Sequence, residues 1–235
     1  MRPTLVFLPG SLCDSRVWRP VVDALGSATP CTVITYGEQD SIKTMASTVL
    51  AAVDGPLIPI GLSMGGIVAL AMWRQAPERI VALGLCGTNP GADTIERKNA
   101  RATQLAIVES DGLQALAEQR LAPAYFAADS AQRAQLTHTV TQMTLDAGKA
   151  RLTAQFAALS SRSDSWPTLP TITVPTLVMF GANDMVCPPQ DQQRMAAQIP
   201  RACVHEIPQA GHLAPLEQAN STAVLIREWL HLLQD

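Results

Sequence analysis

The chain has 235 residues, of which 47% are hydrophobic and 16% are charged, and its formal net charge is −3. This length suits a single domain with a sizeable core, and the lack of a basic excess argues against a nucleic-acid partner. No apolar run reaches the length of a membrane span, and the run before Pro9 is too short for a signal peptide, so we expect a cytoplasmic protein with no membrane partner.

Short apolar segments alternate with helical segments along the chain. Segments that are apolar at nearly every position predict strands at residues 4–8, 31–36, 57–60, 80–86, 176–180 and 203–207. Helical spacing or length predicts helices at residues 17–25, 41–53, 64–75, 190–198 and 215–233, with Pro189 and Pro215 placed at helix starts. Strands that are apolar on both faces suit a parallel sheet, so the pattern predicts a doubly wound α/β fold of about six strands.

Residues 89–170, called the cap from here on, break this alternation. They form helical stretches rich in Ala, Gln, Leu and Arg, interrupted at Gly112, Pro123 and Gly148. We therefore predict one domain over residues 1–235, with a core of 1–88 and 171–235 and an inserted helical cap. Such a cap either shapes access to a site at the strand ends or only buries one face of the sheet.

The sequence Gly61-Leu62-Ser63-Met64-Gly65-Gly66 lies between a predicted strand and a predicted helix. This context places Ser63 at the apex of a sharp turn with positive φ, where the flanking glycines avoid clashes. Gly-x-Ser-x-Gly also occurs in purely structural turns, but the strand, turn and helix around it favour a serine nucleophile.

A serine nucleophile needs a histidine base. The chain has four histidines, and His212 is the candidate because it follows the last predicted strand and precedes the last predicted helix. His138 lies in the cap and His205 in the last strand. His231 lies near the end of the terminal helix, where a surface position is the ordinary expectation.

The base in turn needs an acid that orients it. The loop after strand 176–180 presents Asp184, with Asp191 in reserve, although an Asn-Asp pair also suits a structural turn. The chain order Ser63, Asp184, His212 is the order found in α/β-hydrolases rather than in the major serine proteases.

Attack on a carbonyl creates an oxyanion that two N–H donors must stabilise. We expect the first from the backbone of Met64 at the start of the helix. The second is expected from the loop after the first strand, with the Ser11 N–H favoured and the Leu12 N–H as second choice, unless that loop is a plain turn. We predict that Leu12, Cys13 and Leu213 line the substrate pocket.

Together these motifs resemble the α/β-hydrolase superfamily over nearly the whole chain. Pro9-Gly10 followed by Trp18 resembles its His-Gly…Trp loop, and residues 61–66, 174–184 and 210–212 resemble its nucleophile elbow, acid strand and histidine loop. The cap and compact core are most similar to 3-oxoadipate enol-lactonases and related small esterases. The resemblance implies a serine hydrolase that cleaves a small carboxylic ester, lactone or thioester through an acyl-enzyme on Ser63.

The chain departs from the family pattern at two places. Pro9 stands where the family has a histidine, which alters how the oxyanion loop is braced. The first antiparallel strand pair of the family is missing, because residues 4–8 already form the strand before that loop. We therefore expect about six core strands rather than eight.

The substrate class leaves alternatives open. A substrate with a carboxylate would bind most favourably with a cation in the pocket. Each of the cap cations, however, is also typical of a solvated helix face. These cations are Arg97, Lys98, Arg101, Arg120, Arg133, Lys149 and Arg151. An enol-lactonase-like or carbon–carbon bond hydrolase, and a non-catalytic small-molecule receptor on the same fold, are the alternatives.

The five cysteines are odd in number and lack Cys-x-x-Cys spacing, which argues against disulfides and zinc. We expect reduced thiols, with Cys13 and Cys187 on loops beside the candidate site. The chain also lacks the spacing of a phosphate-binding glycine loop, so we expect no metal and no cofactor.

Overall fold

The computed structural model describes residues 3–27 and 29–233. Six strands form one sheet in the order β2-β1-β3-β4-β5-β6, and every pair of neighbours is parallel. The strands are β1 (Thr4–Leu8), β2 (Cys31–Val33), β3 (Leu57–Leu62), β4 (Leu83–Cys86), β5 (Thr176–Gly181) and β6 (Ala202–Ile207). This confirms the predicted parallel α/β sheet of about six strands.

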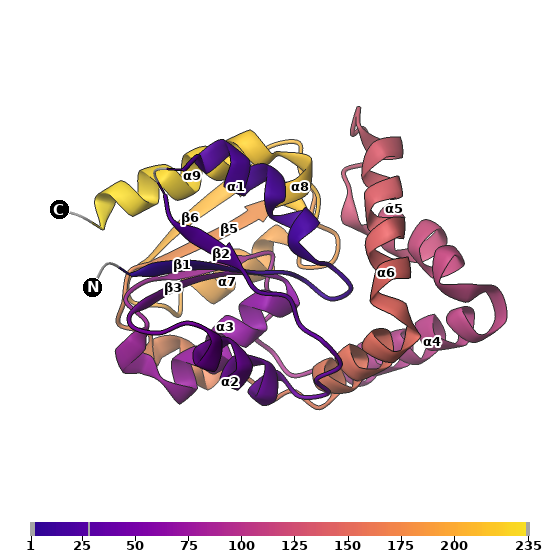
Figure 1. The fold of residues 1–235 in the computed structure, drawn as a ribbon, viewed down its shortest axis with the longest axis horizontal. Helices are drawn as coiled ribbons and strands as arrows, with labels where there is room; N and C mark the ends of the chain where they lie inside the picture. Colours follow the sequence, from indigo (N-terminus) through magenta and orange to yellow (C-terminus); the bar gives the residue numbers. More distant parts are fainter. Residues whose placement is uncertain (1–2, 28, 234–235) are drawn as a thin grey trace.

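Helices cover both faces of the sheet (Figure 1). They are α1 (Arg19–Leu25), α2 (Ile42–Ala52), α3 (Met64–Gln75), α7 (Pro189–Ala196), α8 (Ala214–Glu217) and α9 (Ala219–Leu232). Because successive side chains of a strand point to opposite faces, Leu5 and Phe7 pack in the core with α1 and α9, whereas Val6 and Leu8 pack with α2, α3 and α7. The two layers explain why these strands are apolar at every position.

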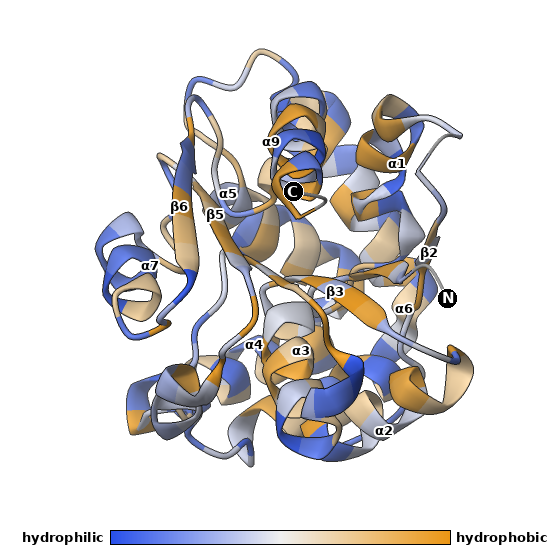
Figure 2. Cartoon of the chain, turned by 90° about the vertical axis from the view of Figure 1, so that its left-hand side faces the viewer, coloured by the Kyte–Doolittle hydropathy of each residue, from blue (hydrophilic) through white to orange (hydrophobic). Residues whose placement is uncertain are grey.

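Helix α3 is the most enclosed of these elements. Its residues from Met64 to Trp73 are all buried, as expected of a helix that is apolar around its whole circumference. Figure 2 shows this hydrophobic character in α3 and β3, while α2 and α7 carry hydrophilic residues on their outer sides. None of the helices in the described part of the chain combines the length and the apolarity that a bilayer crossing requires.

Some predicted boundaries differ from the structure. Strand β2 ends at Val33, and Ile80 forms only an isolated bridge to Leu57 ahead of β4. The predicted helix at 215–233 is two helices, α8 and α9, because Gln218 between them has non-helical dihedral angles of φ −131° and ψ 57°. Helix α1 is preceded by a short 3₁₀ turn, η1 (Ser15–Val17).

The cap runs between β4 and β5 and contains helices throughout its length. They are α4 (Ile95–Leu116), the π-helical turn η3 (Ala117–Leu121), α5 (Ala122–Tyr125), α6 (Arg133–Ser160) and the 3₁₀ segment η4 (Trp166–Thr171). Gly112 and Gly148, with φ of 86° and 75°, kink the two long helices. The cap helices lie beyond the carboxyl ends of the strands (Figure 1), where α/β folds place their binding sites.

Trp18 anchors the loop after β1 to the core. It is 0% exposed, its ring centroid lies 4.8 Å from that of Phe7, and its Nε1–H donates to the Leu8 carbonyl at 3.1 Å. Replacing it removes a large buried side chain and leaves a cavity, which typically costs about 3–5 kcal/mol. We predict a loss of this size in the free energy of unfolding for Trp18→Ala, measured by urea denaturation.

The matched control for this change is Trp166→Ala. Trp166 is only half-buried and lies against the Arg194 guanidinium at 4.6 Å, so its removal is expected to cost less. Equal losses in the two variants would contradict an anchoring role for Trp18.

Candidate active site

Ser63 lies at a sharp turn between the end of β3 and the start of α3. Its φ of 53° and ψ of −113° match the strained conformation predicted from the sequence. A Cβ added at Gly61 would lie 2.2 Å from the Gly65 carbonyl carbon, and one added at Gly65 would lie 2.2 Å from the Leu8 carbonyl oxygen. Only glycine fits at either position, and the turn is pinned to β4 by the Ser63 N–H, which donates to the Cys86 carbonyl at 2.8 Å.

His212 and Asp184 meet in the interior at the ends of β5 and β6. The Nδ1 atom of His212 lies 2.9 Å from Oδ2 of Asp184, and both residues are 2% exposed. The other carboxylate oxygen, Oδ1, accepts from the N–H groups of Val186 and Cys187, each at 2.8 Å. Because a carboxylate can only accept, this arrangement places the proton on Nδ1 and leaves Nε2 of His212 as the free acceptor.

The histidine loop is braced by a residue that the sequence did not single out. Glu217 accepts from the N–H of Gly211 at 2.6 Å and from that of Ala127 in the cap at 3.1 Å. The Leu213 N–H donates to the Tyr125 carbonyl at 3.2 Å, which adds a second tie to the cap. No local pattern marks a buried glutamate at the end of α8, so only the folded chain reveals it.

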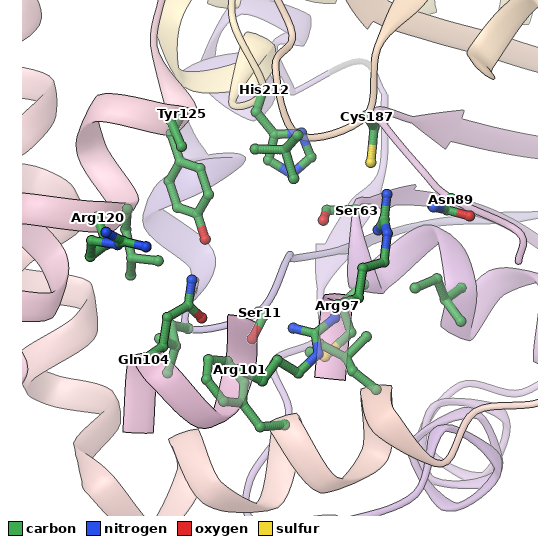
Figure 3. Close-up of a pocket in the computed structure, with 18 of the residues that line it drawn as sticks. Ser11, Ser63, Asn89, Arg97, Arg101, Gln104, Arg120, Tyr125, Cys187 and His212 are labelled. Carbon is green, nitrogen blue, oxygen red and sulfur yellow. The ribbon is translucent and has the colours of Figure 1, made fainter. Parts of the chain in front are cut away.

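A cavity of about 150 Å³ opens between these loops and the cap (Figure 3). Ser63, His212, Met64, Ser11 and Leu12 line its core side, and Tyr125 and Phe156 are among the cap residues on the other side. The Tyr125 ring centroid lies 5.5 Å from that of His212.

Not all of the predicted positions reach the cavity. Cys187 is on its wall, but Cys13 and Leu213, which were predicted to line the pocket, are buried in the core at 5% and 1% exposure. Their side chains point into the packing between the loops and α1 and α9, which a sequence cannot specify for a loop residue.

The other candidates for the acid and the base do not line the cavity. Asp191 is exposed in α7, and it is Asp184 that pairs with His212. His138, His205 and His231 are also exposed.

The loop after β1 is held by a side chain from the cap. The Oε1 atom of Gln155 accepts from the Leu12 N–H at 2.8 Å and from the Ser11 hydroxyl at 3.1 Å. Leu12 has a φ of 59°, and Gln155 is 1% exposed. Within residues 3–27 and 29–233, the N–H groups of Ser11 and Met64 have no protein acceptor. Gln155 thus braces the loop after β1, and its place in an ordinary cap helix gave no sequence signal.

Four arginines from the cap also line the cavity: Arg97, Arg101, Arg120 and Arg162. Three of them were among the cap cations considered from the sequence, whereas Lys98, Arg133, Lys149 and Arg151 do not line it. Arg162 follows the end of α6 and was missed, because its burial depends on contacts with the segment before α4.

Comparison with known proteins identifies the family. The sequence model described as "Alpha/beta hydrolase family" matches residues 5–225. The chain belongs to this family. It is 28% identical over 229 residues to a protein of Variovorax paradoxus named for carbamate hydrolysis (RutD), a match that covers 88% of this chain and 83% of that protein.

Solved structures agree with this assignment. A thermophilic esterase from Thermogutta terrifontis, described with malate bound, superposes with a TM-score of 0.89 at 27% identity and covers 100% of this chain and 92% of the esterase. The enol-lactonase from Burkholderia xenovorans LB400 superposes with a TM-score of 0.85 at 24% identity, covering 98% and 92%. The expected α/β-hydrolase fold and the hydrolase class of enzyme are therefore confirmed.

Neither Cys187 on the cavity wall nor Cys13 in the adjoining core is a reactive thiol. Burial raises the pKa of Cys13 and of Cys187 to about 12, so both remain protonated near neutral pH, and it is the thiolate that reacts. Within the described residues, His, Cys, Asp and Glu side chains do not gather in a group of three or more that could hold a metal ion.

We predict that iodoacetamide modifies the half-buried Cys31 and Cys203 before Cys13 and Cys187 in the folded protein. The reason is that burial suppresses the thiolate and blocks access more strongly at Cys13 and Cys187 than at Cys31 and Cys203. Peptide mass mapping after a time course of alkylation measures the order. Early modification of Cys187 would show that its surroundings are open and its thiolate accessible.

Proposed function

We propose that this protein hydrolyses carboxylic esters of small molecules through an acyl-enzyme on Ser63. The observation that carries the proposal is that Ser63 and His212 open onto one cavity while Asp184 holds the far nitrogen of His212 at 2.9 Å. The structural likeness to the Thermogutta terrifontis esterase supports an ester as the substrate. Lactone and thioester carbonyls present the same electrophile, so they fall within the proposed chemistry.

The first half-reaction forms the acyl-enzyme. Ser63 Oγ attacks the carbonyl carbon while Nε2 of His212 takes the hydroxyl proton, and Asp184 stabilises the resulting imidazolium. The carbonyl oxygen becomes an oxyanion, which the N–H groups of Met64 and Ser11 bind because neither has a protein acceptor in the described residues. His212 then gives its proton to the alcohol oxygen as the ester bond breaks.

The second half-reaction releases the acid. Water enters the cavity, His212 removes one of its protons, and the hydroxide oxygen attacks the acyl carbon of the ester on Ser63. The same two N–H groups bind the second oxyanion, and its collapse returns the proton to Ser63 Oγ. In this proposal residues 1–235 act as one domain in which the cap, residues 89–170, encloses the acyl group and limits the size of the substrate.

Removing either reacting side chain tests the assignment. We predict that Ser63→Ala and His212→Ala each lower kcat for p-nitrophenyl esters by several orders of magnitude, because attack and proton transfer depend on them. Asp184→Asn is expected to lower kcat by about 10⁴-fold, since the amide favours the wrong histidine tautomer.

The matched control is His205→Ala, which removes an exposed histidine from β6. It should leave the rate unchanged. Wild-type-like turnover in the Ser63 or His212 variant, with purity checked by mass spectrometry, would refute the proposed mechanism.

Gln155 is proposed as a positioning residue, and its substitution is a separate test of the oxyanion loop. In Gln155→Leu the Leu12 N–H and the Ser11 hydroxyl lose their shared acceptor. Loss of a buried partner costs about 1–3 kcal/mol of stability, and a displaced Ser11 N–H is expected to lower kcat by about 10- to 100-fold. Steady-state kinetics should place the loss in kcat rather than in KM.

Gln135→Leu, on the exposed side of the same helix, is the control for this change. A variant at Gln155 that melts earlier but keeps its kcat would show that the contact is structural only.

A further inference from the structure

The wall of the candidate site is strongly cationic. Arg97, Arg101, Arg120 and Arg162 line the cavity, and no acidic side chain of the described residues lines it. In Figure 3, Arg120 lies beside Tyr125 and Gln104, and Arg97 and Arg101 approach the space in front of Ser63. The chain as a whole is acidic, with a net charge of −3, so this concentration of positive charge is local to the cavity.

Two of the four arginines are fixed by one buried carboxylate behind the wall. Asp93 Oδ2 lies 2.7 Å from Nε of Arg101, and its Oδ1 lies 3.1 Å from Nη1 of Arg162. The Arg101 guanidinium also lies 5.3 Å from the centre of the Phe156 ring. One carboxylate shared by two guanidinium groups holds both in place but compensates only one of their two positive charges.

Arg162 is the most deeply buried of the four arginines. Its side chain is 2% exposed, its Nε–H donates to the Gly91 carbonyl at 2.7 Å, and its buried Nη2 has no acceptor within the described residues. A buried guanidinium with unpaired N–H groups is costly, and burial together with the charges of Arg101 and Arg97 lowers the pKa of Arg162 to about 10. An anion in the cavity would offset both effects.

The other two arginines are available to bind. Within residues 3–27 and 29–233, Arg97 and Arg120 form no ion pair with a carboxylate. Arg97 is half-buried and Arg120 is exposed at the edge of the cavity. A planar guanidinium presents two parallel N–H donors that match the two oxygens of a carboxylate.

We propose that the cavity selects esters that carry a carboxylate, such as the half-ester of a short dicarboxylic acid. Arg97 and Arg120 bind that carboxylate while the ester carbonyl lies at Ser63. The Asp93-bound pair of Arg101 and Arg162 supplies a fixed positive field behind it. This inference rests on the proposed ester hydrolysis and adds its substrate class. A volume of about 150 Å³ suits a short chain between the two groups.

The test compares two esters that differ only at the far end of the acyl chain. Monomethyl glutarate carries a carboxylate where methyl pentanoate carries a methyl group, and a pH-stat assay measures release of acid from either. A charge-assisted hydrogen bond contributes about 1.5–3 kcal/mol, so we expect kcat/KM to favour monomethyl glutarate by about 10- to 100-fold.

The variants Arg97→Gln and Arg120→Gln should each reduce this preference by about tenfold, which corresponds to loss of one such bond. Arg101 and Arg162 are not substituted, because loss of either would leave the buried Asp93 carboxylate without one of its two ion-pair partners. Lys98→Gln is the matched control, since Lys98 is an exposed cation next to Arg97 on the same helix and does not line the cavity. Equal kcat/KM for the two esters, or an equal loss in the Lys98 variant, would overturn the inference.

Failure to cleave either ester would count against the proposed function rather than against the anion site. A binding measurement tests the anion site in that case. Calorimetry on the Ser63→Ala protein with glutarate, pentanoate and inorganic phosphate measures the anion site without catalysis. Tighter binding of glutarate than of pentanoate, weakened by added salt and by Arg97→Gln, supports the site. Binding of phosphate as tight as that of glutarate would overturn the assignment to carboxylates.

Discussion

The contact between the turn at Ser63 and the end of β1 is the constraint on which the site depends. The helix that follows Ser63 can start so close to β1 only because Gly65 presents no side chain to the Leu8 carbonyl. That approach brings the loop after β1 and the first turn of α3 together, and with them the N–H groups of Ser11 and Met64. The parallel sheet then delivers the loops after β5 and β6 to the same edge, where His212 and Asp184 pair.

Much of this arrangement could be predicted from local sequence. Strands buried on both faces carry an unbroken apolar signal, and the positive φ at Ser63 follows from a serine between glycines at a junction of strand and helix. His212 and Asp184 could be selected because each follows a strand whose carboxyl end must lie at that edge. These features depend on residues close in sequence, so the sequence is enough to find them.

The features that could not be predicted depend on contacts between distant segments. Gln155 reaches Leu12 across 143 positions, and Glu217 reaches Ala127 across 90. Arg162 is buried only because the cap folds back on Asp93. The inward direction of Cys13 arises in the same way, since tertiary packing decides where the side chain of a loop residue lies.

The ties that Gln155 and Glu217 make have a consequence for how this fold can diversify. The cap holds the loop after β1 through one of them and the histidine loop through the other. A different cap grafted onto the same core must therefore supply its own acceptor for Leu12 and its own backbone donor for Glu217. Under the proposed function the cap both encloses the substrate and holds the two loops that carry the reacting groups, so exchange of caps is expected to change turnover together with specificity.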